Sequence, residues 1–156
     1  MSDVHDPATR SRNMSAIRSK NTKPELLIRR GLHARGFRFR LHDKVLPGTP
    51  DIVLRRYSAL IDVRGCFFHG HDCNLFRLPR TRRDFWESKI SSNRRRDIKT
   101  ASELQDMGWR VAIVWECALR GPKKINSETV IDSLAQWLSS DEKLFEIRGV
   151  DSCSPP

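Results

Sequence analysis

Four residues with metal-binding side chains fall in one short segment and at one distant position. Segment 63–73, VRGCFFHGHDC, contains Cys66, His71 and Cys73 in the spacing C-x4-H-x-C, and Cys117 follows 44 positions after Cys73. Three thiolates and one imidazole form a closed set of the kind that holds structural zinc. The spacing predicts a Zn²⁺ site that ties this segment to the end of a distant strand.

Two alternatives to this ligand set remain open from the sequence. His69 competes with His71, because the two lie two positions apart and a four-ligand site needs only one of them. Cys117 could instead be a buried thiol with no metal partner. If His71 binds zinc, His69 is free for chemistry, and Cys153 is left as an unpaired thiol.

A second constellation surrounds Asp51, which follows PGTP and opens the apolar segment DIVL. A carboxylate at the mouth of a strand can bind a hard cation such as Mg²⁺, which prefers oxygen ligands. The remaining ligands would come from the neighbouring strand near Asp62, Val63 and Arg64. The structural alternative is that Asp51 only shapes the entry to the strand.

Two further groups could serve that site. His69 could act as a general base on water, and Glu25 could reach the site from the start of a helix. Each also has a structural explanation, as a partly buried loop histidine and as an acid at a helix N-terminus.

The elements expected to position these groups form one α/β domain over residues 1–156, with a mixed sheet flanked by helices. Thr22 is the expected cap of the second helix, and Gly36 its end. Residues 1–22 are expected to form a basic DNA-contacting helix, and residues 141–156 a mobile tail. Periodicity predicts helices at 8–20, 24–35, 84–107 and 127–140, and strands at 37–41, 51–56, 58–63 and 109–115.

The charge balance indicates a polyanionic partner. The chain has 29 Lys and Arg against 19 Asp and Glu, a net charge of +10, which is typical of nucleic-acid binding. No apolar run reaches the roughly 18 residues that a membrane span needs. The first 13 residues lack the apolar core of a secretory signal, so we expect a cytoplasmic protein.

Five motifs, taken together, resemble the very short patch repair (Vsr) DNA mismatch endonuclease family. They are DVHDPATRSRNMSAI, LPGTPDIVL, GCFFHGHDCNLFRLP, TRRDFWESKISSNRRRD and ELQDMGWRVAIVWECAL, and they span roughly residues 3–120. The resemblance implies a restriction-endonuclease-like fold with a structural zinc. It implies Mg²⁺-dependent nicking of one strand 5′ to the T of a T:G mismatch, which arises when 5-methylcytosine deaminates at a methyltransferase target.

The resemblance also implies roles for individual residues. Asp51 matches the metal-binding carboxylate, with the Val63 carbonyl as a second Mg²⁺ ligand, and His69 matches the base. Glu25 and Asp97 match accessory acids. The zinc ligands implied by position are Cys66, His71, Cys73 and Cys117.

Other matched residues would contact the DNA. Phe67, Phe68 and Trp86 match side chains that wedge into the base stack from the major groove. Met14 and Ile17 match apolar residues that enter from the minor groove, and Lys89 and Asn93 match residues that contact the T:G pair. Such wedges cost a few kcal/mol of unstacking, which is cheaper at a mismatch.

The chain departs from the family pattern near the active site. Phe68 stands in place of Trp, Val63 in place of Thr, and Arg64 in place of His. Asp62 replaces an apolar residue, so Asp62-x-Arg64, eleven residues after Asp51, resembles the acid-x-base half of a restriction-type motif. Asp62 could then add a metal ligand, and Arg64 a phosphate contact.

Three functions follow as hypotheses. The first is a mismatch-specific nicking enzyme, functionally paired with a DNA cytosine-5 methyltransferase in the bacterial nucleoid. The second is a restriction-type endonuclease at matched sites, and the third is a catalytically silent, zinc-containing DNA-binding module. An asymmetric mismatch suits a monomer.

Overall fold

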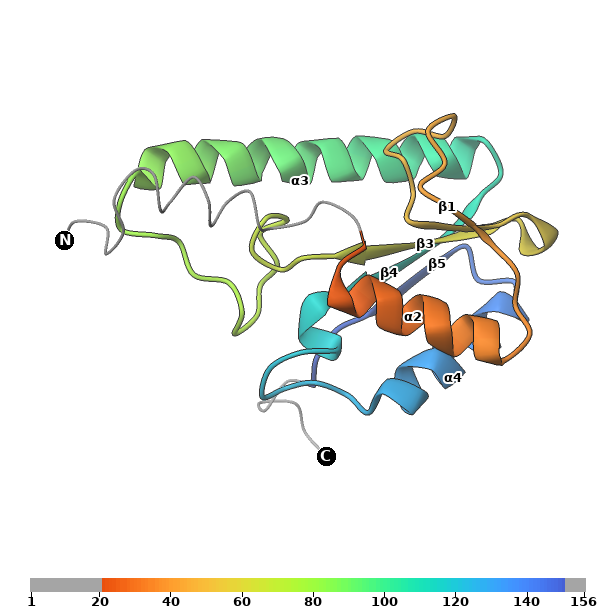
Figure 1. The fold of residues 1–156 in the computed structure, drawn as a ribbon. Coiled ribbons are helices and arrows are strands. Elements are labelled where there is room, and N and C mark those ends of the chain that lie inside the picture. Colours follow the sequence, from red (N-terminus) through yellow and green to blue (C-terminus); the bar gives the residue numbers. More distant parts are fainter. Residues whose placement is uncertain (1–20, 151–156) are drawn as a thin grey trace.

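The computed structural model describes residues 21–150 (Figure 1). The helix expected at 8–20, with Met14 and Ile17, lies outside these residues. None of the helices in the described part of the chain is long and apolar enough to cross a bilayer.

A five-stranded mixed sheet forms the centre, in the order β1-β2-β3-β4-β5. The pairs β1–β2 and β2–β3 are antiparallel, whereas β4 runs parallel to both β3 and β5. The strands are β1 (Arg40–Leu41), β2 (Ile52–Leu54), β3 (Ala59–Arg64), β4 (Arg110–Trp115) and β5 (Leu144–Ile147).

Helices cover both faces of this sheet (Figure 1). Helix α3 lies on one face and α2 and α4 lie on the other, and each face has its own apolar cluster. The helices are α2 (Lys23–Ala34), α3 (Arg83–Asp106) and α4 (Ser127–Leu138), and short 3₁₀ turns occupy η1 (Arg55–Tyr57) and η2 (Glu116–Ala118).

The alternation of β3 divides its side chains between the two faces. Ala59 and Ile61 pack with α2 and α4, whereas Leu60 packs in the cluster under α3. Asp62 and Arg64 therefore follow Leu60 onto the α3 face, at the carboxyl end of the strand. The hairpin predicted for β2 and β3 is confirmed by their antiparallel pairing.

The predicted limits of α2 are confirmed. The Thr22 hydroxyl accepts a hydrogen bond from the Glu25 N–H at 3.4 Å, and proline occupies the first turn, where its missing N–H costs little. The chain leaves the helix through Gly36, whose φ of +90° lies in the left-handed region that glycine adopts without strain.

One prediction of secondary structure is confirmed only in part, and another is wrong. The strand expected at 37–41 is limited to Arg40–Leu41, because Phe37 and Phe39 pack against the apolar cluster before pairing begins. The tail expected from residue 141 contains β5, which pairs with β4, and Phe145 stacks on Trp137 at 6.1 Å between ring centroids. Pairing with β4 stabilises a segment whose own sequence is short and half polar.

Candidate active site and metal centre

Asp51 lies where β2 begins, next to the carboxyl end of β3. The Val63 N–H donates to its Oδ2 at 2.8 Å, and the Asp51 N–H donates to Asp62 Oδ1 at 3.3 Å. Both contacts follow from the antiparallel register of the two strands. The predicted neighbourhood of Asp51, Asp62 and Val63 is thus present at the end of β3, where Asp62 lies on the α3 face and the Val63 side chain packs on the α2 and α4 face.

Burial raises the pKa of both carboxyl groups. The pKa of Asp51 is raised to about 7, first by burial and then by the negative charge of Asp62, although the Val63 N–H opposes the shift. Burial also raises the pKa of Asp62, against the opposing charge of Arg64, whose NH2 atom is 4.0 Å away. A cation beside these groups would relieve both penalties.

Glu25 approaches Asp51 through His42. The Glu25 side chain is 2% exposed, and its Oε1 lies 2.5 Å from His42 Nε2, which is 3.9 Å from Asp51 Oδ1. Arg29 also donates to Glu25 Oε1. The sequence interpretation omitted His42, because only the register of β1 against β2 places it opposite Asp51.

His69 and Asp97 form a hydrogen-bonded pair between the loop after β3 and helix α3. His69 Nδ1 and Asp97 Oδ2 are 2.6 Å apart, and both side chains keep partial exposure. The charges of His69 and Asp97 both act on the pKa of Asp62. One network of charges therefore extends from Asp51 through Asp62 to the His69–Asp97 pair.

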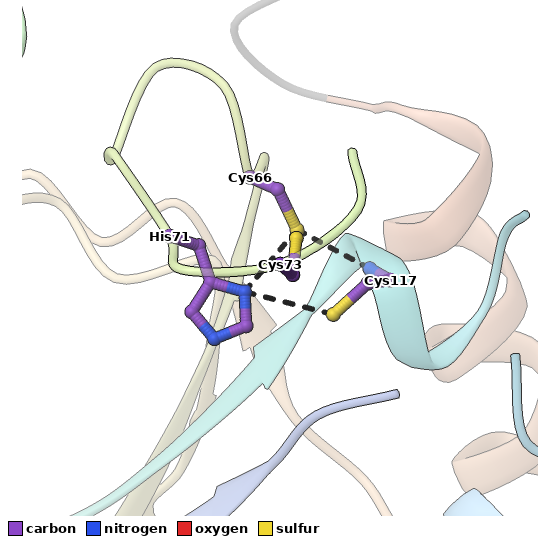
Figure 2. A group of neighbouring side chains, drawn as sticks. All are labelled: Cys66, His71, Cys73 and Cys117. Atoms are coloured by element: carbon purple, nitrogen blue, oxygen red, sulfur yellow. Dashed lines mark hydrogen bonds between the residues drawn. The ribbon is translucent and has the colours of Figure 1, made fainter. Parts of the chain in front are cut away.

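The three residues of the spacing C-x4-H-x-C and the distant Cys117 converge on one point (Figure 2). The loop after β3 supplies Cys66, His71 and Cys73, and the turn after β4 supplies Cys117. His71 Nδ1 lies 3.6 Å from each of the Cys66 and Cys117 sulfurs, and one ligand atom from each residue lies within 4.8 Å of the others. This group could hold a metal ion.

Burial disfavours the thiolate form of these cysteines when no metal ion is bound. It raises the pKa of both the Cys66 and the Cys117 thiol, so each thiol stays protonated unless a cation compensates its charge. The imidazole of His71 is held flat against Trp115, with ring centroids 3.9 Å apart and 6° between planes. His69, the alternative ligand, is engaged by Asp97 instead.

Aromatic side chains gather between the loop after β3 and the start of α3. The ring centroid of Phe67 lies 5.1 Å from that of Phe68 and 5.2 Å from that of Trp86. Phe76, which the sequence interpretation omitted, joins at 6.2 Å from Phe67. The group is half-buried, so part of its apolar surface faces solvent.

The two residues expected to contact a base pair differ in their surroundings. Lys89 is exposed on α3. Asn93, one turn further on, donates through Nδ2 to the Phe68 carbonyl at 2.8 Å. In this structure the amide of Asn93 therefore holds the loop that carries Phe68.

Comparison with known proteins places this chemistry in a class. A family model described as DNA mismatch endonuclease Vsr matches residues 2–75. The chain is 47% identical to the DNA mismatch endonuclease Vsr of Escherichia coli strain K12 over 141 residues, which is 90% of each protein.

Two further relatives are named as nicking enzymes. The type II nicking enzyme V.XorIIP of Xanthomonas oryzae pv. oryzae is 50% identical over 76% of this chain and 88% of its own length. The type II nicking enzyme V.NmeAIP of Neisseria meningitidis serogroup A is 46% identical over 77% of this chain and 86% of its own length.

The fold, the acidic site and these relatives define a DNA nicking endonuclease, a hydrolase of DNA mismatch repair. The chain belongs to the Vsr DNA mismatch endonuclease family.

Proposed function

We propose that the protein nicks one strand of duplex DNA 5′ to the T of a T:G mismatch, in a reaction that requires Mg²⁺. The observation that carries the proposal is the convergence of Asp51, Asp62 and the His69–Asp97 pair at one end of β3. In a family of mismatch endonucleases, this is the place where a phosphodiester bond would be cleaved.

The residues around Asp51 fit a hard divalent cation. The Asp51 carboxylate and the Val63 carbonyl would supply oxygen ligands, and the raised pKa of Asp51 shows how poorly the site tolerates its charge alone. Bound Mg²⁺ would stabilise the negative charge that develops on the phosphate during cleavage. Arg64 lies on the same face and is proposed to contact that phosphate.

His69 is the proposed general base. If its Nδ1–H is donated to Asp97, Nε2 is left as the proton acceptor, and the ring is held in one orientation. Nε2 would take the proton of the attacking water. Asp97 would stabilise the imidazolium that results, and Glu25 would act on Asp51 through His42.

We propose zinc for the group of three Cys and one His. A tetrahedral ion with bonds of about 2.3 Å to sulfur and about 2.0 Å to nitrogen sets these atoms about 3.6 Å apart. His71 Nδ1 lies at 3.6 Å from two of the sulfurs, which supports an ion of this size. Its role would be structural, because four protein ligands leave no open position.

DNA recognition would come from the loop after β3 and helix α3. We propose that Phe67, Phe68 and Trp86 wedge into the stack from one groove and that Met14 and Ile17 enter from the other. Lys89 and Asn93 would contact the T:G pair. Asn93 could do so through its carbonyl oxygen while its amide holds the Phe68 carbonyl.

The wider assignment follows from the same reaction. We propose a restriction-endonuclease-like fold, a monomer that acts in the nucleoid of a bacterial cytoplasm, and functional pairing with a DNA cytosine-5 methyltransferase. That methyltransferase would create the 5-methylcytosine whose deamination gives the T:G substrate.

A nicking assay tests the proposal. End-labelled duplexes with a central T:G or C:G pair, in several methylation-target contexts, would be incubated with Mg²⁺ and wild-type protein or Asp51→Asn. We expect one nick, on the T strand only, in the T:G duplex, and its loss in the variant. Cutting of both strands at matched sites would favour a restriction-type enzyme. Binding without cleavage would favour the silent module.

A further inference from the structure

Glu25, His42 and Asp51 meet from three separate parts of the chain. Glu25 lies in the first turn of α2, His42 directly follows β1, and Asp51 directly precedes β2. One ligand atom from each lies within 4.8 Å of the other two. Two carboxylates and an imidazole are a donor set for a divalent ion, and only Asp51 has a metal role above.

The backbone fixes His42 beside Asp51. The β1–β2 ladder pairs Arg40 with Val53 and Leu41 with Ile52, and the His42 N–H continues it by donating to the Asp51 carbonyl at 3.1 Å. His42 adopts a left-handed φ of +47°, which is uncommon for a residue other than glycine. Its side chain is thereby held toward Glu25 and Asp51 rather than toward solvent.

The two oxygens of Asp51 face different neighbours. Oδ2 accepts the Val63 N–H, on the side of β3, whereas Oδ1 is the atom nearest His42 Nε2. A carboxylate oriented in this way can bridge two ions about 3.5–4 Å apart, as in two-metal nucleases. One ion would lie toward Val63 and the other toward Glu25 and His42.

Small movements would open the second position. Ligand atoms that are neighbours on an octahedral ion with bonds of about 2.1 Å lie about 3 Å apart. The Glu25–His42 contact of 2.5 Å would lengthen, and the His42–Asp51 separation of 3.9 Å would shorten. Neutral His42 frees Nε2 for the ion by carrying its proton on Nδ1.

Arg29 sets the strength of the site. Its NH2 atom donates to Glu25 Oε1 and lies 3.2 Å from His42 Nε2. The guanidinium group therefore lies close to the position of the ion, and its positive charge repels a cation there. The side chain is 13% exposed and cannot simply swing into water. An ion at this position is therefore bound weakly, and removal of the Arg29 charge strengthens it.

We propose that Glu25, His42 and Asp51 form a second divalent-cation site that prefers first-row transition ions such as Mn²⁺ to Mg²⁺. The preference comes from the imidazole of His42, because such ions accept nitrogen ligands whereas Mg²⁺ favours oxygen. The proposal shares Asp51 with the proposed magnesium site, but it does not depend on T:G specificity or on the nicking reaction.

Mn²⁺ binding to the purified full-length protein, without DNA, tests the site. Electron paramagnetic resonance of free Mn²⁺ gives the stoichiometry, and electron spin echo modulation detects a ¹⁴N nucleus on the bound ion. The variants are His42→Gln, Arg29→Gln and His69→Gln. His33→Gln is the matched control, because His33 is exposed on α2 and lies outside the site.

We expect two Mn²⁺ ions and a ¹⁴N signal in the wild type. His42→Gln should weaken one of them by 10- to 100-fold, the range for loss of a metal-site residue, and abolish the signal. Arg29→Gln should tighten that ion, and His69→Gln and His33→Gln should leave it unchanged. A single ion, or a ¹⁴N signal that survives in His42→Gln, would overturn the site even if the nicking assay succeeds.

Discussion

At the scale of single residues, two largely buried carboxyl groups define the acidic site. Asp51 and Asp62 are separated by ten residues, yet the Asp51 N–H contacts the Asp62 carboxylate. Burial of both groups, and the charge of Asp62 beside Asp51, make the ionised carboxylates unfavourable in the folded protein, as is common at functional sites.

Asp51→Asn should therefore stabilise the protein while it abolishes nicking. The folded pKa of Asp51, about 7, exceeds the ordinary value of 3.8. The folded state holds the proton more tightly, so the wild type loses stability as pH rises from about 4 to 7. Asparagine cannot ionise, and it keeps an oxygen for the Val63 N–H.

The measurement is urea unfolding without added Mg²⁺, between pH 5.5 and 8.5. We expect the advantage of Asp51→Asn to grow with pH and to reach the order of 1–4 kcal/mol above pH 7. Asp43→Asn is the control, because Asp43 pairs with Arg55 and should gain nothing. An advantage that does not change with pH would contradict the assigned cause.

Cys117→Ser should lower zinc content and stability together. Cys117 supplies the fourth ligand of the proposed zinc site from the turn after β4, and a bound ion would contribute to folding because the unfolded chain has no preformed site. We expect loss of the bound ion and about 3–5 kcal/mol of unfolding free energy. Cys153→Ser makes the same chemical change outside the described residues. Full zinc occupancy in Cys117→Ser would refute the assignment.

At the scale of elements, helix α3 positions the loop after β3. Asn93 and Asp97 are four residues apart and lie on one side of the helix. Asn93 holds the Phe68 carbonyl and Asp97 holds His69. The proposed wedge and the proposed base are thus attached to the same helix, so their relative position is fixed by its geometry.

Gly70→Ala should loosen this attachment. Gly70 has a φ of +61°, and a Cβ atom there would lie 2.6 Å from Ile90 Cγ2 on α3. Gly36→Ala is the matched control, because Gly36 has a φ of +90° with open space around it. We expect about 1 kcal/mol of destabilisation for Gly36→Ala and about 2–4 kcal/mol for Gly70→Ala. Nicking should fall only in Gly70→Ala; equal activity in the two variants would contradict the role of this contact.

Phe67→Ala should reduce discrimination more than affinity. Phe67 contacts both Phe68 and Trp86, so its removal breaks the centre of the aromatic group. Phosphate contacts supply most of the affinity for any duplex and do not involve this ring. We expect the preference for T:G over C:G duplexes to fall by tenfold or more in a binding titration. Equal losses on both duplexes would contradict the wedge.

At the scale of the whole molecule, the net charge of +10 should make DNA binding strongly dependent on salt. Residues 1–20 contain four cations, at positions 10, 12, 18 and 20. If all four contact phosphates, deletion of residues 2–20 should reduce the slope of log affinity against log salt by up to about 3.6. An unchanged slope, measured by fluorescence anisotropy on a matched duplex, would show that this segment does not bind DNA.

The long helix, the β2–β3 hairpin, the candidate metal-binding cysteines and the family could all be predicted from the sequence. These depend on local spacing, on periodicity or on motifs that survive in the order of the chain. The proposed zinc ligands are an example, because C-x4-H-x-C brings three of them together within one loop.

Which groups meet across the sheet depends on the tertiary structure. β5 exists because β4 offers it a parallel partner, and His42 reaches Asp51 because an antiparallel ladder places it there. The structure likewise shows His69 on Asp97 and His71 among the cysteines, a choice that the sequence left open. Contacts between distant segments depend on register and burial, which composition and spacing do not encode.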